Sequence, residues 1–383
     1  MNQAIPNSAD LEPLAPRAEP AVRQSSKAVE FARVTKRYGP VIAVDAVDFV
    51  VERGTLVTLL GPSGCGKTTT LRLIAGLETA SEGRMFIDGE DVTHRAASER
   101  DVSMVFQSYA LFPHMTVMEN VCYGLRASGI SRRDAGQMAA EKLKTVGLTG
   151  FETRLPSELS GGQQQRVAVA RAIVLEPKVL LFDEPLSNLD AKMRRRVRED
   201  IRGLQQGLGL TVVYVTHDQE EALAVSDRII VMKDARIAQD GSPRDLYERP
   251  TDRFVADFIG NANILPVALH RDGGDMARAV LGGLELRLPH RGQGTGPAEL
   301  AVRPQAFRLR SSAPEAGEIG GTVRKAAYLG SHMEYELALD DIPGEMFVID
   351  REVAAPHPVG ARVAVAIDAS GAAIIPSGGD PSP

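Results

Sequence analysis

Apolar and polar positions divide the first two thirds of the chain into predicted strands and helices. Val29–Val34 and Ala43–Glu52 alternate apolar and polar side chains, which is typical of half-buried strands, and Lys36–Gly39 between them is predicted to form a turn. Longer apolar runs indicate strands that are buried on both faces of a parallel sheet. Three segments have this pattern: Leu56–Leu60, Val179–Phe182 and Thr211–Thr216. Shorter strands are predicted at Gly83–Gly89 and Val102–Phe106.

Helical periodicity dominates residues 113–157. Ser131 followed by Asp134 has the form of a capping box, which predicts a helix start. After it, five apolar side chains share one helical face: Ala135, Met138, Ala139, Leu143 and Val146. Packing of this helix on its own domain accounts for that stripe. Two further helices are predicted, an apolar one at Val167–Leu175 and a highly charged one at Ala191–Leu208.

The order of these elements predicts two domains. Alternating strands and helices over residues 28–260 predict an α/β domain with a mostly parallel sheet, and residues 113–158 form a helical subdomain within it. Beyond 260, short apolar runs are separated by Gly, Pro and Asp turns, which predicts a small all-β domain over 261–376, an OB-like barrel. The runs that indicate it are Glu299–Val302, Gly321–Leu329 and Arg362–Ile367.

Composition narrows the class of protein. The chain has 383 residues, 43% of them hydrophobic and 25% charged, as is ordinary for a soluble protein of two or three domains. A net charge of −6 gives no indication of a global nucleic-acid surface. Cys65 and Cys122 are the only cysteines, which favours a reducing cytosol over a disulfide framework. No run reaches the 18 to 20 apolar residues of a membrane span, and residues 1–27 and 377–383 are predicted to be disordered tails.

The stretch from Gly61 to Thr69 has the phosphate-loop pattern G-x-x-x-x-G-K-[ST], placed between a predicted strand and a predicted helix. Its glycines allow the backbone N–H groups to approach phosphate oxygens, and the helix points its positive end at the same place. Lys67 supplies charge for the outer phosphates, and Thr68 offers a hydroxyl to Mg²⁺. The alternative is a structural glycine turn. Cys65 is interpreted as a small loop residue rather than a nucleophile.

Two carboxylates follow the buried strand Val179–Phe182. Asp183 is placed to help hold Mg²⁺, and Glu184 is placed to act as general base on the attacking water. The alternative is a pair of solvated loop residues. Their position after a buried strand, downstream of a phosphate loop, favours the functional interpretation.

Four weaker signals join this set. Ser160-Gly161-Gly162-Gln163 places a hydroxyl and two glycines at a predicted helix start, which is either a second anion site, supplied to another copy of the chain, or an ordinary turn. Gln107 and His217 each follow a predicted strand, where ligand crevices of doubly wound sheets lie. Either one alone is more simply structural, and Tyr38 alone is a plain surface tyrosine.

Together these motifs resemble those of ATP-binding-cassette (ABC) ATPases. Over residues 28 to about 260 the whole set occurs in the family's order: Tyr38, Gly61–Thr69, Gln107, Leu159–Gln163, Val179–Glu184, Ser187–Asp190 and His217. The resemblance implies a P-loop NTPase cassette and an ATPase that uses ATP and Mg²⁺. It also implies that two copies of the chain enclose the nucleotide.

The resemblance further assigns roles within one copy. Tyr38 stacks on adenine, Glu184 activates water, and His217 grips the γ-phosphate. Gln107 senses Mg²⁺ and faces a membrane partner. The nucleotide loop consists of Gly61, Pro62, Ser63, Gly64, Cys65, Gly66, Lys67, Thr68 and Thr69, and the metal residues are Thr68, Gln107 and Asp183.

Other roles implied by the resemblance concern the second copy. Ser160, Gly161, Gly162 and Gln163 cap the ATP that the other copy holds. Asp190 links the two sites across the dimer. The partners are therefore a second copy and two transmembrane permease subunits, with a periplasmic or lipid-anchored solute-binding protein acting indirectly, and no nucleic acid is expected.

Within the family the chain resembles motor subunits of binding-protein-dependent importers, including those for ferric iron, polyamines and 2-aminoethylphosphonate. Arg303-Pro304, Gly321–Val323 and Tyr328–His332 are similar to the β-rich C-terminal domain of such subunits. This implies a peripheral protein on the cytoplasmic face of the inner membrane. One alternative is a soluble ABC ATPase that acts on ribosomes or DNA, although neither heptads nor an internal repeat occurs here. The other is a P-loop kinase or GTPase, against which the Ser160 segment and the Asp183-Glu184 pair argue.

Overall fold

The strand that leads into the phosphate loop, β3 (Leu56–Leu60), lies inside a six-stranded sheet of order β10-β9-β3-β8-β7-β6. This computed structural model describes residues 26–187 and 189–376, so most of the two predicted tails lies outside the described residues. All neighbours in the sheet pair in parallel except β10 and β9. The other five strands are β6 (Val102–Val105), β7 (Val179–Asp183), β8 (Val212–Thr216), β9 (Arg228–Lys233) and β10 (Arg236–Gly241). The predicted mostly parallel sheet is confirmed.

Successive residues of the central strands enter two different cores. Val179 and Leu181 of β7 face helix α1 (Lys67–Ala75) and the antiparallel sheet, whereas Leu180 and Phe182 face the helical side. Both sets are at most 2% exposed. Burial on both faces is the physical reason that these strands read as continuous apolar runs.

A second, antiparallel sheet of order β2-β1-β4-β5 covers α1. Its strands are β1 (Lys27–Tyr38), β2 (Val41–Glu52), β4 (Glu82–Ile87) and β5 (Glu90–Asp91). The predicted turn at Lys36–Gly39 is wrong, because Lys36, Arg37 and Tyr38 all belong to β1. Backbone pairing with β2 continues to the Tyr38–Val41 pair, so the turn is reduced to Gly39 and Pro40.

The predicted helical region contains α2 (Val117–Ala127) and α3 (Arg132–Thr145), which pack with α4 (Gly161–Ile173). Ser131 caps α3 as predicted, by accepting a hydrogen bond from the Asp134 N–H. The Asp134 carboxylate accepts from the Ser131 hydroxyl instead of the backbone N–H, so the capping box is only half formed. The predicted apolar stripe on α3 is buried, with Met138 at its edge.

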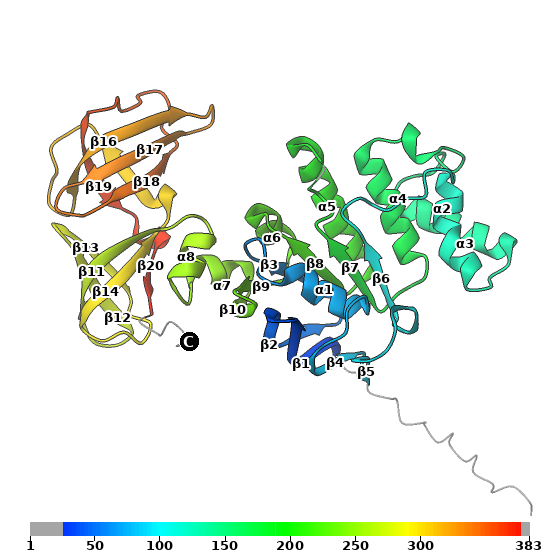
Figure 1. The fold of residues 1–383 in the computed structure, drawn as a ribbon. Helices are drawn as coiled ribbons and strands as arrows, with labels where there is room; N and C mark the ends of the chain where they lie inside the picture. Colours follow the sequence, from blue (N-terminus) through cyan, green and yellow to red (C-terminus); the bar gives the residue numbers. More distant parts are fainter. Residues whose placement is uncertain (1–25, 188, 377–383) are drawn as a thin grey trace, which may run out of the picture.

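The remaining helices flank the sheet and continue toward the C-terminal part (Figure 1). They are α5 (Ala191–Leu208), α6 (Gln219–Val225), α7 (Pro243–Glu248) and α8 (Arg253–Phe258), and single 3₁₀ turns lie at Ala97–Glu99, Pro156–Glu158, Pro304–Ala306 and Ala369–Gly371. The bounds of α5 agree with the prediction. Among the described helices, none is both long and apolar enough to cross a membrane.

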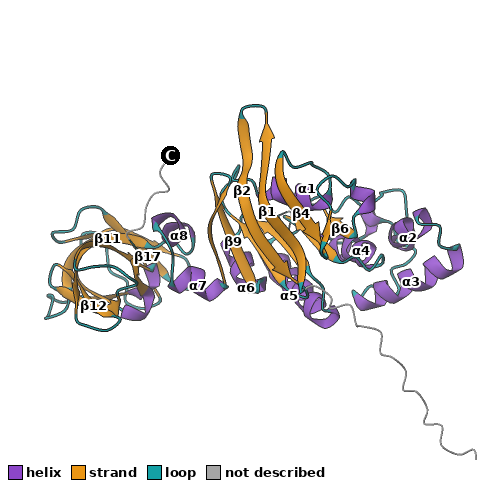
Figure 2. Ribbon diagram, turned by 90° about the horizontal axis from the view of Figure 1, so that it is seen from below, coloured by secondary structure: helices purple, strands orange, loops and turns teal. Residues whose placement is uncertain are grey.

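The predicted all-β part is confirmed and consists of two curled five-stranded sheets around one core (Figure 2). The first sheet has the order β13-β12-β11-β14-β20, and the second β15-β19-β16-β17-β18. Their bounds are β11 (Asn263–Arg271), β12 (Met276–Leu281), β13 (Leu284–Pro289), β14 (Gly296–Val302), β15 (Phe307–Arg310), β16 (Ile319–Tyr328), β17 (Met333–Leu339), β18 (Glu345–Asp350), β19 (Arg362–Ile367) and β20 (Ala372–Ile375).

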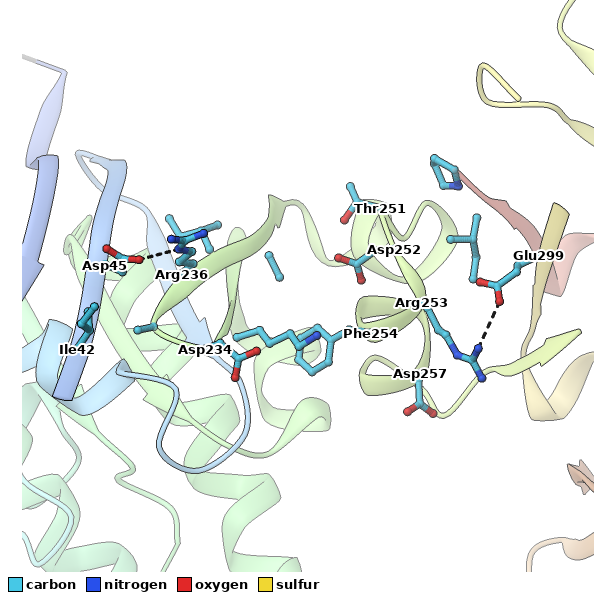
Figure 3. Close-up of a pocket in the computed structure, with 16 residues that line it drawn as sticks. Ile42, Asp45, Asp234, Arg236, Thr251, Asp252, Arg253, Phe254, Asp257 and Glu299 are labelled. Atoms are coloured by element: carbon cyan, nitrogen blue, oxygen red, sulfur yellow. Dashed lines mark hydrogen bonds and ion pairs between the residues drawn. The ribbon is translucent and has the colours of Figure 1, made fainter. Parts of the chain in front are cut away.

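A groove of about 1260 Å³ lies between the two parts of the chain. On one side Arg236 pairs with Asp45, and on the other Arg253 pairs with Glu299 (Figure 3). The residues that line this groove include none of the predicted site residues. The candidate site therefore lies elsewhere, at the carboxyl ends of the parallel strands.

Candidate active site

The phosphate loop surrounds the side chain of its own lysine, Lys67. Lys67 is 5% exposed, and its Nζ donates to the carbonyl oxygens of Gly61 and Pro62, both at 2.8 Å. Gly66 has φ +102°, and a Cβ there would lie 2.2 Å from the Ala43 oxygen, so only glycine fits. The loop is thus held in a curled conformation with its ammonium group at the centre.

The same loop leaves room and donors for an anion. Gly64 has φ +82° with open space where a Cβ would be, and Ser63 beside it is exposed. Helix α1 begins at Lys67 without a side-chain cap, whereas each of α2 to α8 is capped by a side chain. Its first-turn N–H groups therefore point at the loop, which fits the phosphates of a nucleotide.

Asp183 and Thr68 come together at this edge of the sheet. Burial raises the pKa of the Asp183 carboxyl, while the charge of Arg72 and a hydrogen bond with Thr68 oppose that shift. A hydroxyl and a carboxylate oxygen fit Mg²⁺. The described residues contain no cluster of three or more His, Cys, Asp or Glu that could hold a metal ion. A magnesium ion here would need phosphate oxygens and water to complete its ligands.

Glu184 and His217 form the second cluster. Glu184 Oε2 lies 3.1 Å from Nδ1 of His217, and the Glu184 N–H donates to the Val215 oxygen of β8 at 3.0 Å. Glu184 has φ +45°, a left-handed conformation that is costly for a residue with a Cβ. This backbone turn directs the carboxylate away from the strand and toward the imidazole.

Gln107 is joined to the same region through Ser187. Gln107 Nε2 donates to Ser187 Oγ at 3.1 Å, and that hydroxyl donates to the Glu184 carbonyl at 3.0 Å. The structure therefore brings Gln107, Glu184 and His217 together. No local feature of the sequence indicates that the Ser187 hydroxyl would bridge two loops, so the motif Ser187–Asp190 did not predict this contact.

Tyr38 lies at the end of the β1–β2 hairpin, 44% exposed. Lys36 Nζ is 4.7 Å from the centroid of its ring. Burial, together with a hydrogen bond to Glu78, raises the pKa of Tyr38, and a hydrogen bond with Thr69 opposes the shift. Tyr38 therefore lies beside the first turn of α1, with an exposed aromatic ring.

The Ser160 segment forms a complete capping box. The Ser160 hydroxyl accepts from the Gln163 N–H, and Gln163 Oε1 accepts from the Ser160 N–H at 2.9 Å. A Cβ on Gly161 would lie 2.9 Å from Leu189 Cδ2, and one on Gly162 would lie 2.8 Å from Met193 Sδ.

A methyl group at either position would displace the end of the Leu189 or Met193 side chain, so the two glycines allow close packing of α4 against the start of α5 within one chain. Asp190 caps α5 by accepting from the Met193 N–H at 2.9 Å. The segment therefore packs with the Asp190 region, whereas Thr68 and Asp183 form a separate group at the phosphate loop.

Two known protein families match separate parts of the chain. Residues 44–187 match the ABC transporter family, and residues 300–375 match the TOBE domain. The chain is 57% identical over 355 residues to a protein of Brucella abortus (strain 2308) named Fe(3+) ions import ATP-binding protein FbpC, covering 93% of this chain and 99% of that protein. The chain belongs to the ABC transporter family. It is an ATP-binding ATPase of that family, as the motifs predicted.

Other ABC proteins are similar at different levels. A protein of Escherichia coli O157:H7 with the same printed name is 51% identical over 82% of this chain and 87% of its own length. Among solved structures, cbiO1 from Clostridium perfringens, part of the ABC transporter complex cbiONQ, has a TM-score of 0.55 at 26% identity, covering 58% of this chain and 92% of that one. The dimeric structure of a bacterial ABC transporter cassette has a TM-score of 0.51 at 33% identity, covering 56% and 99%.

Proposed function

We propose that this chain is the ATP-hydrolysing motor subunit of an importer for ferric iron. The observation that carries the proposal is its 57% identity, over nearly the full length of both chains, to a protein named for Fe(3+) import. The alternative of a soluble ABC ATPase that acts on ribosomes or DNA is not favoured. The similar proteins are named for import, and the similarity extends over both parts of this chain. Polyamines and 2-aminoethylphosphonate, the cargoes of the other importers that the chain resembles, serve as comparison solutes in the test.

The proposed reaction at one site uses the contacts described above. Lys67 exchanges its two carbonyl partners for phosphate oxygens, and Tyr38 stacks on the adenine ring. Glu184 accepts the proton of the attacking water while His217 orients that carboxylate and binds the γ-phosphate. Thr68, Asp183 and Gln107 are the residues that would hold Mg²⁺, which neutralises charge on the phosphates.

The proposed assembly is a dimer that encloses two nucleotides. The Ser160–Gln163 segment of one copy covers the ATP on the phosphate loop of the other, and Asp190 lies between the two sites. Two permease subunits dock near Gln107, and a solute-binding protein acts outside the membrane. This chain lies on the cytoplasmic face of the membrane as a peripheral protein. Because ATP binds the closed dimer better than the open one, binding drives closure and hydrolysis reverses it. We assign this motor to residues 28–260 and a transport-associated role to 261–376.

Uptake of radiolabelled cargo tests the proposal. A strain that lacks this gene should lose uptake of ferric iron, and the wild-type chain should restore it whereas Glu184→Gln should not. Putrescine and 2-aminoethylphosphonate uptake, measured in the same cells, should remain unchanged. Normal ferric iron uptake in the deletion strain, with loss of either other cargo, would contradict the proposed substrate.

A further inference from the structure

The guanidinium group of Arg194, in the first turn of α5, lies between two loops of the candidate site. Its NH1 donates to Asp218 Oδ2 at 3.3 Å and its NH2 donates to the Leu189 carbonyl at 3.3 Å. Its Nε lies 3.8 Å from Glu221 Oε1, is buried, and makes no hydrogen bond with any residue that the structure describes. One planar side chain thus contacts the segment that precedes α5 and the turn that carries His217.

The His217 side of this contact is a buried hydrogen-bond network. Glu221 is 3% exposed, and its Oε2 accepts from Tyr214 at 3.2 Å and from Thr216 at 2.8 Å. The Asp218 N–H donates to the Thr216 hydroxyl at 3.0 Å, and the Asp218 carboxylate caps α6. These residues flank His217 on both sides in the chain, so a shift of the network would displace the backbone that carries the imidazole.

The Leu189 side of the contact faces two other parts of the site. Leu189 packs against Gly161, at the start of α4. Ser187, two residues earlier, accepts from Gln107 and donates to the Glu184 carbonyl. A contact made by a second copy on this segment would therefore reach Arg194 directly.

Stability of α5 itself does not explain an arginine at this position. A cation in the first turn interacts unfavourably with the positive end of the helix. The Arg194 side chain is 35% exposed, so most of its surface is covered by contacts with the rest of the chain. Arg195, the next residue, offers the contrast: its side chain is 77% exposed, and its ion pair to Glu199 lies within the helix.

We propose that Arg194 is a positioning residue for ATP hydrolysis, which couples the Leu189–Asp190 segment to the turn that carries His217. Contact of the second copy with that segment moves the guanidinium and brings its Nε into hydrogen-bond distance of Glu221. This holds His217 in the 3.1 Å contact with Glu184 that one chain already forms. The inference rests on the proposed roles of His217, of Glu184 and of the dimer.

Steady-state ATP hydrolysis by the full chain tests the inference, with Arg194→Met compared to Arg195→Met. Misplacement of a catalytic group predicts that Arg194→Met lowers kcat about 10- to 100-fold while the KM for ATP stays within about twofold. Arg195→Met should retain wild-type kinetics. Combining Arg194→Met with Asp218→Asn should cost much less than the product of the two single effects, because both remove the same contact.

Two further measurements separate this role from a purely structural one. Thermal unfolding should give similar midpoints for both methionine variants, and Arg194→Lys, which keeps the charge without the planar fork, should recover only part of kcat. If Arg194→Met does not fold, Arg194→Lys takes its place in the comparison. Wild-type kcat in the Arg194 variant beside an inactive His217→Ala would overturn this inference alone. Wild-type hydrolysis by His217→Ala would overturn the proposed role of His217 and the inference with it, whereas the proposed function is overturned separately by the uptake measurement.

Discussion

His217 Nδ1 lies 3.1 Å from Glu184 Oε2, although 33 residues separate the two in the chain. Glu184 follows β7 and His217 follows β8, and these two strands are parallel neighbours. Glu184 reaches the imidazole because its backbone turns left-handed directly after the strand, with φ +45°. The pair is therefore preformed by sheet topology and by one unusual backbone conformation.

Replacement of Glu184 by glutamine should separate ATP binding from hydrolysis. The amide keeps the shape of the side chain but cannot accept the proton of water, so we expect kcat to fall about 100-fold or more. ATP should stay bound and stabilise the dimer, which size-exclusion chromatography with ATP would detect. Glu220→Gln, an exposed residue on α6, is the matched control and should hydrolyse normally. A Glu184→Gln monomer that turns over ATP at the wild-type rate would contradict the assignment.

Substitution of Gly64 should weaken ATP binding as well as stability, because Gly64 lies beside the proposed phosphate site. Gly64 has φ +82° and Gly129 has φ +85°, and an added Cβ meets nothing within 4 Å at either one. Alanine should therefore cost each site about 1–2 kcal/mol of stability. Only Gly64→Ala should also weaken ATP binding, by about tenfold or more, because the methyl group would occupy the space for phosphate. Equal nucleotide affinities of the two variants, measured by titration calorimetry, would contradict this assignment of the loop.

Asp227 should stabilise the fold at neutral pH and lose that effect in acid. A hydrogen bond from Arg202 lowers the pKa of Asp227, as does one from the Leu56 N–H at the start of β3. Because the folded-state pKa lies below the ordinary value of about 3.9, the stabilisation is complete above that pH and disappears as the pH falls through the folded-state pKa.

Thermal unfolding from pH 7 to pH 3 measures this effect. Asp227→Asn should unfold at a lower temperature than wild type at pH 7, and the difference should shrink toward pH 3. Asp101→Asn, an exposed position, is the control. A difference that grew in acid would show that the carboxylate is not held in its charged form.

Arg303 should anchor the C-terminal part to the helices that precede it. Its guanidinium is buried, stacks 4.2 Å from the Tyr247 ring, and donates to the carbonyls of Tyr247, Ala256 and Ile259. Arg303→Met would remove this donor from all three carbonyls, of which Ala256 keeps a bond from the Ala262 N–H. The cost is roughly 1–3 kcal/mol for each carbonyl that is left unpaired and that water does not reach.

The expected results are a lower midpoint in urea denaturation followed by circular dichroism, and faster proteolysis between α8 and β11. Arg308→Met, at an exposed arginine of the same region, should change neither measurement. Unchanged proteolysis in Arg303→Met would argue that the two parts are held together by other contacts.

Local features of the sequence determined the elements and most of the candidate site. The apolar run before Gly61 and the glycine pattern after it define a strand, a loop and a helix from neighbouring residues alone. Helix α5 has its predicted bounds because Asp190 caps one end and Gly209 ends the other in a left-handed conformation. The run Val179–Phe182 likewise placed Asp183 and Glu184 at a strand end, since burial on both faces leaves a readable pattern.

Only the tertiary structure decided which of these residues meet. Gly161 and Gly162 lie against the side chains of Leu189 and Met193, and no local feature of the sequence indicates a contact between residues so far apart in the chain. The β1–β2 turn was misplaced because cross-strand pairing, not the polar character of Lys36–Tyr38, sets where a hairpin ends. The contacts made by Ser187, Arg194 and Arg303 depend on strand order and helix packing. The hydrophobic periodicity of the sequence does not predict which distant residues these bring together.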